Sequence, residues 1–315
     1  MGEMMLKQLS WRLCQAAFVI LAVGILTFVL VQALPGDMAW RIASGRYGYD
    51  RVDLAAVAQV KQQLADMTAQ GSALGQWMWD LLRFNFGRSL VSGEPVSGEL
   101  VWQLKQTFAL AGFSLLLTLL LIIPLGIWAG CHPGRFLDRA INGAAAILKS
   151  VPHFALGLLL IVLFALRLDW LPSAGQGNWR HFILPSVTLA LPLSAVGARV
   201  VREATFQAVT ASWYRWGAQK GLSQPRLFWR HALRNLSVPV VTWLGMQFVW
   251  LVEGVVVVET LFAWPGIGHA LVHAIFARDV PVIQASAMVL GLTFVTLNML
   301  VDGLCYVLDP RGKRI

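Results

Sequence analysis

Long apolar runs, separated by short charged stretches, are the feature that most constrains how this chain folds. The runs lie between Leu13 and Asp37, Gln106 and Arg135, Ala140 and Arg167, His181 and Arg199, Asn235 and Glu259, and Val280 and Asp302. Most of them reach the roughly 20 residues that a helix needs to cross a bilayer, where no backbone polar group can stay unpaired. The sequence therefore predicts an all-α, polytopic membrane protein with six transmembrane helices.

Composition agrees with this fold class and argues against a nucleic-acid-binding protein. Hydrophobic residues make up 57% of the 315 residues and charged residues only 13%, about half their share in soluble domains. The net charge of +9 could indicate nucleic acid, but membrane topology explains it more simply. The isolated cysteines Cys14, Cys131 and Cys305 indicate neither a disulfide framework nor a zinc site, and we expect them to be small packing residues.

The positions of the basic residues predict the orientation in the membrane. One face collects Lys7 and Arg12, Arg135 and Arg139, the basic residues from Arg199 to Arg234, and the basic residues of the C-terminus. On the other face, Leu34 to Lys105 carries equal numbers of basic and acidic residues. By the positive-inside rule both termini are cytoplasmic in a multi-pass protein of the bacterial inner membrane. The first apolar run is too long for a cleaved signal, so we expect it to stay as an anchor.

We expect three segments along the chain: residues 1–34 with the first transmembrane helix, 35–105 as an outer helical region, and 106–315 as a five-helix core. The outer region opens with a turn at Pro35, and its pattern predicts a helix from Asp53 to Met67 and a further apolar stretch from Trp77 to Gly87. His269 to Ala277 is a helix too short to span. We expect it to lie at the outer interface.

Prolines inside two of the spans indicate broken helices. Pro152 lies in the third span, and Pro185 and Pro192 lie in the fourth. A proline frees a carbonyl group and kinks a helix unless neighbours compensate. Such breaks fit helices that line a cavity, although prolines also occur in spans without that role.

A basic segment from Ala211 to Asn235 lies between two of the spans and cannot cross a bilayer. Its cations alternate with an apolar stripe made of Trp213, Tyr214, Trp216, Leu222, Leu227, Phe228 and Leu233. Start and stop signals predict two short helices, the first ending at Lys220 with Gly221 as a left-handed cap, the second beginning at Ser223 with Pro225 in its first turn. We interpret the segment as a rigid docking element.

Signatures of an enzyme or motor are missing from the sequence. The only Gly-Lys pair, at Gly312, lacks the upstream glycine of a phosphate-binding loop, and neither H-E-x-x-H nor G-x-S-x-G occurs. We therefore expect a transport subunit without catalytic residues or cofactors, whose energy comes from a partner.

Several stretches resemble one known family, the permease subunits of ATP-binding-cassette (ABC) importers of the dipeptide, oligopeptide and nickel class. The similar stretches are Tyr214 to Asn235, Phe84 to Val96, Val256 to Gly268, and Asp302 with Leu308 to Arg311. The resemblance implies the ABC importer permease fold with a cytoplasmic coupling helix. Its implied partners are a second homologous permease, two cytoplasmic ATPase subunits carrying MgATP, a periplasmic or surface solute-binding protein and the lipid bilayer.

The resemblance also implies which residues couple the chain to the ATPase. These are Tyr214, Trp216, Gly217, Ala218, Lys220, Gly221, Leu222, Arg230, His231 and Arg234. The aromatic and leucine stripe would lie in a groove of an ATPase subunit, with the arginines at its border. The alternative is an amphipathic helix that only lies on the membrane surface.

Two ionisable residues inside spans, Lys149 and Glu253, are candidates for the solute pathway because such groups are costly to bury in a membrane. They have opposite charge and either pair as a gate, bind a zwitterionic solute, or serve packing alone. We add Ser150, Pro152 and His153 as further pathway candidates, because they mark the expected kink.

The identity of the solute stays open. We favour nickel or a metal chelate because the regions around Ala263 and Arg278 resemble that branch, with di- or oligopeptide import as the alternative. His269 and His273 are one helical turn apart and could share a metal, but ordinary surface histidines explain them better, so we assign no metal ligand. An ATPase-independent transporter or channel is the rival from another class; it predicts an inverted repeat or intramembrane carboxylates, and neither is evident.

Overall fold

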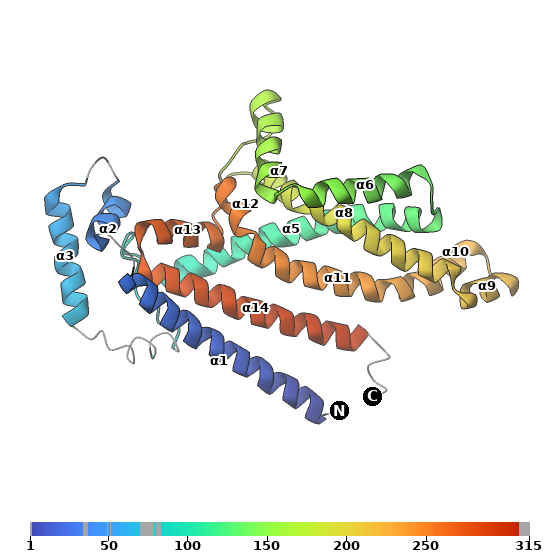
Figure 1. Ribbon diagram of the computed structural model, residues 1–315, viewed down its shortest axis with the longest axis horizontal. Helices are drawn as coiled ribbons and strands as arrows, with labels where there is room; N and C mark the ends of the chain where they lie inside the picture. Colours follow the sequence, from blue (N-terminus) through green and yellow to red (C-terminus); the bar gives the residue numbers. More distant parts are fainter. Residues whose placement is uncertain are drawn as a thin grey trace. The chain divides into compact units, whose positions relative to one another are not determined.

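The computed structural model describes residues 2–33, 37–48, 50, 52–69, 79 and 83–308, and its named elements are helices (Figure 1). The elements in chain order are α1 (Gly2–Ala33), α2 (Met38–Tyr47), α3 (Leu54–Ala69), α5 (Val96–Cys131), α6 (Phe136–Ser150), α7 (His153–Leu160), the π-helix η2 (Ile161–Arg167), α8 (Arg180–Thr210), α9 (Ser212–Gln219), α10 (Gln224–Leu227), the π-helix η3 (Phe228–Ala232), α11 (Leu233–Gly254), α12 (Val256–Leu261), α13 (Ile267–Ala277) and α14 (Val280–Leu308). The predicted all-α class is confirmed.

Five helices in the described residues are long and apolar enough to cross a membrane, and a sixth candidate span is broken. The five lie in α1, α5, α8, the continuous stretch from α10 to α11, and α14. The sixth is α6 followed by α7 and η2, which meet at a bend of 102°. Six spans are thus present if the bent pair counts as one.

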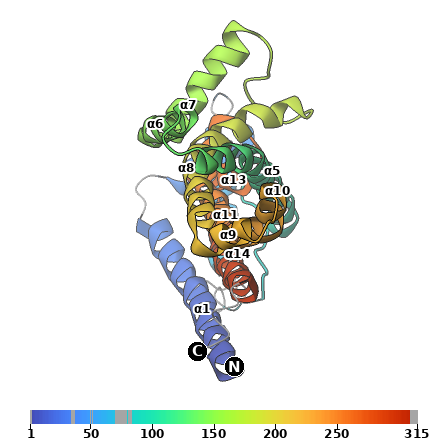
Figure 2. The same cartoon turned by 90° about the vertical axis from the view of Figure 1, so that its right-hand side faces the viewer.

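The bend has a local cause. Proline disfavours the helical conformation in the residue before it, and Val151, which precedes Pro152, is extended with ψ 122°. Figures 1 and 2 show α7 turning away from the line of α6. The break expected at Pro152 is therefore present, whereas α8 continues through Pro185 and Pro192 as one helix.

The chain divides into two compact units, and two long helices pass from one to the other. Unit 1 comprises residues 1–107 and 265–296, and unit 2 comprises residues 108–264 and 297–315. In unit 1, α2 packs on α3 through Ile42 and Val60, and α13 packs near the start of α5. The predicted helix at Asp53 corresponds to α3, and the predicted short helix at His269 corresponds to α13.

Two predictions about the outer region fall wholly or partly on residues that the structure does not describe, and the prediction about the cysteines is wrong. Pro35 and part of the stretch from Trp77 to Gly87 lie outside the described residues. Cys14 and Cys131 are exposed, so the expectation that they pack inside the protein is wrong. The side chain of Cys305 lies outside the described part.

Unit 2 is built around α8, which contacts α6, α7, α9, α11 and α12. Glycines let α5 approach α8 closely, because a Cβ at Gly126 would lie 2.5 Å from Val201 Cβ and one at Gly130 would lie 2.6 Å from the Arg202 carbonyl oxygen. On another side, Gly197 of α8 faces the ring of Trp243 in α11. The central helix of unit 2 is thus fixed by close backbone packing.

Candidate functional site

The basic segment between α8 and α11 forms a hairpin of helices at one end of unit 2. Ala211, with an extended ψ of 148°, separates α8 from α9. Helix α9 ends at Gln219, and Gly221 follows with φ +83°, a conformation that glycine adopts without the Cβ penalty. The predicted helix and its glycine cap are therefore confirmed.

The second predicted helix differs from the expectation. Pro225 lies in the first turn of α10 as predicted, but Ser223 makes no side-chain cap hydrogen bond. Helix α10 is also not a separate short element, because it continues through η3 into α11. The second arm of the hairpin is therefore the beginning of a candidate membrane-spanning helix.

Much of the apolar stripe faces the chain's own helices. Tyr214 and Leu227 are buried in a small core with Ala208 and Ala232, and the Tyr214 hydroxyl donates to Gln224 Oε1 at 3.0 Å. Leu222 is partly buried against the same core. This differs from the expectation that the whole stripe faces outward: these side chains anchor α9 to α8 and α10.

The outward side of the hairpin carries indoles and cations. Trp216 and Trp229 are 67% and 66% exposed. The exposed residues of the predicted coupling set are Trp216, Lys220, Gly221, Arg230, His231 and Arg234. Gly217 and Ala218 are half-buried, because α9 packs closely on α10: a Cβ at Gly217 would lie 2.6 Å from Leu227 Cδ1.

A cavity of about 280 Å³ in unit 2 contains two of the predicted pathway residues. Its lining comprises Pro152, His153, Phe154, Leu189, Leu193, Trp250, Leu251, Gly254 and Val257. The His153 and Trp250 ring centroids are 6.4 Å apart. The His153 imidazole, which follows the bend between α6 and α7, and the Trp250 indole of α11 thus lie at an otherwise largely apolar wall formed by α7, α8, α11 and α12.

The other pathway candidates lie apart from this cavity or outside the description. Lys149 and Ser150 are exposed in the last turn of α6 and do not contribute to the lining. The side chain of Glu253 lies outside the described part of the structure, so its pairing with Lys149 stays a prediction.

The two histidines of α13 are close to each other, with ring centroids 4.4 Å apart. Burial, and to a smaller extent His273, lower the pKa of His269. Among the residues that the structure describes, no group of three or more His, Cys, Asp or Glu side chains could hold a metal ion.

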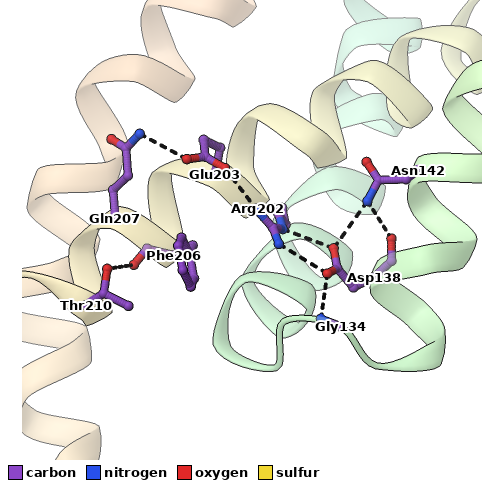
Figure 3. Close-up of polar contacts among 8 residues, drawn as sticks. All are labelled: Gly134, Asp138, Asn142, Arg202, Glu203, Phe206, Gln207 and Thr210. Carbon is purple, nitrogen blue, oxygen red and sulfur yellow. Dashed lines mark hydrogen bonds and ion pairs between the residues drawn. The ribbon is translucent and has the colours of Figure 1, made fainter.

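Sequence reasoning missed an ion pair between α6 and α8 (Figure 3). Arg202 Nε and Nη2 donate to the two carboxylate oxygens of Asp138 at 3.0 and 3.1 Å. In the sequence, Arg202 is one of the basic residues from Arg199 to Arg234 that predict the orientation in the membrane. The available signal was Asp138 itself, the only carboxylate in the sequence between Glu99 and Asp169.

Comparison with known proteins identifies the family to which this arrangement belongs. Residues 122–314 match the family described as "Binding-protein-dependent transport system inner membrane component". The glutathione transport system permease protein GsiC of Salmonella typhimurium is 36% identical over 97% of this chain and 98% of its own length. A putative peptide transport system permease protein of Brucella melitensis is 37% identical over 98% of this chain and 99% of its own length.

Solved structures share the fold at low sequence identity. An amino acid ABC transporter chain is 14% identical, with a TM-score of 0.54 over 67% of this chain and 94% of its own length. The methionine ABC transporter MetNI, in an inward-facing conformation, is 16% identical, with a TM-score of 0.56 over 69% of this chain and 99% of its own length. The chain therefore belongs to the binding-protein-dependent inner-membrane transport components, as a permease subunit of an ABC importer of the dipeptide, oligopeptide and nickel class.

Proposed function

We propose that this chain forms part of the pathway of an ATP-driven importer of short peptides of the glutathione type. Relatives named for glutathione and for peptides, each aligned over nearly the whole chain, support this class of solute. The relatives reported above are named for glutathione and for peptides, so the nickel or metal-chelate preference expected from the sequence becomes the competing outcome of the uptake experiment below.

The docking of an ATPase subunit on the hairpin of α9 and α10 is the central part of this proposal. The observation that carries it is the division of the hairpin into an anchored side and an exposed side. Tyr214 and Leu227 hold α9 in place, while Trp216 and Arg230 face outward. Exposed tryptophan and arginine, backed by a rigid support, are the residue types that dominate binding energy at interfaces.

Docking of the ATPase subunit on the hairpin also implies a membrane topology and a set of partners. The hairpin and both termini would lie in the cytoplasm, and residues 35–105 on the opposite side would face the solute-binding protein. A second, homologous permease would complete the pathway. Two ATPase subunits would bind MgATP, so this chain needs no cofactor of its own.

The cavity at the bend between α6 and α7 supplies a wall for the pathway. Its lining is largely apolar, and its volume of about 280 Å³ is close to the lower end of the range for small-molecule sites. We expect side chains of the passing peptide to contact Trp250 and His153 briefly. Weak contact suits a pathway, because a tightly held solute would not leave.

The docking proposal is tested by a substitution of Gly221 to Asp. The change strains a left-handed residue and places a carboxylate among the exposed cations of the hairpin. We expect ATP-driven uptake by the reconstituted complex to fall at least roughly tenfold, by about 1.4 kcal/mol of coupling, with a normal amount of permease in the membrane. Gly48, which has a similar φ of +85°, is the matched control, and Gly48→Asp should leave uptake nearly unchanged. Full transport by Gly221→Asp would exclude docking at this turn.

The solute class is tested by uptake in cells that lack the gene and in cells that carry it again. Labelled glutathione, a labelled dipeptide, and nickel with and without a chelator are the probes. Restored glutathione or dipeptide uptake supports the proposal. Restored nickel uptake alone would replace it and would make His153, His269 and His273 the first residues to mutate.

A further inference from the structure

We propose that the ion pair between Asp138 and Arg202 transmits movement of the docking hairpin to the wall of the cavity. This inference rests on the proposed function and adds a positioning role for two residues that belong neither to the cavity lining nor to the predicted coupling set. Helix α8 carries Arg202 and leads into α9, while α6 carries Asp138 and ends beside the cavity.

The Asp138 carboxylate is fixed on all sides (Figure 3). Besides the two bonds from Arg202, its Oδ2 accepts from the Gly134 N–H at 2.8 Å, and Oδ1 accepts a longer bond from Asn142 Nδ2 at 3.4 Å. Its side chain is 7% exposed and that of Arg202 is 23% exposed. A bidentate arginine–carboxylate contact fixes the relative orientation of the two groups as well as the distance between them.

The guanidinium is held in turn by residues of the following turns of α8. Arg202 Nη1 donates to Glu203 Oε2 at 3.0 Å, and Glu203 Oε1 accepts from Gln207 Nε2 at 3.1 Å. The guanidinium carbon also lies 5.3 Å from the centre of the Phe206 ring. Ala208, one residue after Gln207, belongs to the core that anchors Tyr214 of α9. Side-chain contacts therefore lead from Asp138 to Gln207, and the backbone of α8 joins Gln207 to the core that anchors the hairpin.

Helix α6 is suited to act as a lever. Asp138 lies in its first turn, and twelve positions separate it from Ser150, which is about 18 Å along a helix. Immediately beyond lie the bend and the cavity residues Pro152 and His153. A rotation imposed at the first turn of a stiff helix shifts its far end, which is where the cavity wall begins.

Apolar packing alone would not fix the position of α6 on α8. Ile141 of α6 belongs to one buried apolar cluster with Ala198 and Val201 of α8, and hydrophobic burial has no preferred direction. Removal of two charges from water largely offsets the attraction of a buried ion pair. The pair therefore contributes position more than stability, which is the property a transmission element needs.

The experiment compares Asp138→Asn and Arg202→Lys with wild type in the complete complex with its permease, ATPase and binding-protein partners. Arg199→Gln is the matched control, since Arg199 is an exposed cation on the same helix. We expect each variant of the pair to keep basal ATP hydrolysis within about twofold and to transport roughly tenfold less solute per ATP hydrolysed. The control should match wild type in both quantities.

A second measurement follows the cavity wall directly. A cysteine replaces Phe154, which lines the cavity, in a chain whose own cysteines are changed to serine, and its reaction with a thiol reagent is timed with and without ATP. We expect ATP to change the rate in an otherwise intact chain but not beside Asp138→Asn.

Two results would overturn the inference. One is that solute transported per ATP is unchanged in both variants of the pair. The other is that transport and ATP hydrolysis fall together with the amount of assembled complex, which would make the pair a folding element. Failure of the proposed function itself is distinguishable, because the wild-type complex would then show no ATP-driven uptake.

Discussion

Two buried carboxylates, Asp138 in unit 2 and Asp279 in unit 1, are held by different kinds of partner. Asp279 is 3% exposed, and it accepts hydrogen bonds from the Ser89 hydroxyl and from the backbone N–H groups of Leu90 and Val91, the last two at 3.1 and 3.3 Å. Asp138 is held mainly by a guanidinium on another long helix. The first carboxylate organises a turn, whereas the second joins two helices.

The difference indicates two roles for a buried carboxylate: one holds the shape of a loop, and the other couples the movement of two helices. The turn at Ser89 is closed again by its own hydroxyl, which accepts from the N–H groups of Val91 and Ser92, so the partners of Asp279 are members of one compact loop. The partners of Asp138 and Arg202 extend along α8 toward the docking hairpin. We expect loss of the first to lower stability, and loss of the second to lower coupling.

The largest effect is expected from Gly130→Leu, which disturbs the close contact between α5 and the part of α8 that carries Arg202. Leucine at this position would collide with the Arg202 carbonyl oxygen and with Thr205. Overpacking of this kind costs about 1–3 kcal/mol or more, and a displaced α8 could not hold Asp138, so uptake should fall to background.

The matched control for this change is Gly112→Leu, on the same helix but with no heavy atom within 4 Å of the added Cβ. Uptake and thermal unfolding in detergent are measured for both variants. Uptake by Gly130→Leu above half of the wild-type rate would show that close contact between α5 and α8 is not required.

A smaller, purely structural effect is expected from Asp279→Ala. The change leaves the N–H group of Leu90 without its carboxylate acceptor, while the N–H group of Val91 keeps the Ser89 hydroxyl, and this should cost roughly 1–3 kcal/mol of folding free energy. Thermal unfolding in detergent should show the loss, while solute transported per ATP by the folded fraction stays at the wild-type value. Asp279→Asn, which keeps an acceptor oxygen, should lose less. If Asp279→Ala uncouples transport as Asp138→Asn does, the two carboxylates do not differ in role.

The smallest effect is expected at an exposed carboxylate, Asp37, which lies 2.8 Å from Lys61 with both side chains largely in solvent. The hydrogen bond from Lys61 lowers the pKa of Asp37 below its ordinary value of 3.8. The folded state therefore gains stability from this pair at pH values above the ordinary pKa, and loses it as the pH falls through the lowered one.

Exposed pairs contribute about 0–1 kcal/mol, so Lys61→Ala should shift the unfolding temperature by a small amount at pH 7, and this shift should disappear as the pH falls through the lowered pKa of Asp37. Thermal unfolding across this pH range checks the prediction. A shift at pH 7 as large as that of Asp279→Ala would contradict the ranking of the three carboxylates by burial.

Local residue chemistry made much of the fold predictable. Apolar runs determined which helices are long enough to span, because an unpaired backbone group is too costly in hydrocarbon. Pro152 marked the break between α6 and α7, and Gly221 marked the end of α9. The break at Pro152 and the cap at Gly221 depend on the backbone preferences of a few adjacent residues.

The side of α9 on which the apolar stripe is buried could be determined only from the structure. Helix α9 has aromatic residues on more than one side, namely Trp213, Tyr214 and Trp216, so its sequence leaves several faces eligible for burial. Ala208 and Leu227 pack around Tyr214, so the side of α9 that carries Tyr214 is the buried one.

The chain's sequence by itself determined the membrane class, the broken third span, the glycine-capped hairpin and the resemblance to importer permeases, since each is encoded within a short window or a direct motif. Only the tertiary structure decided that Asp138 meets Arg202, 64 positions away, and that Pro152 and His153 line a cavity with Trp250. Contacts of this kind depend on how helices pack across the whole unit, and no local preference of a residue records which distant side chain will lie beside it.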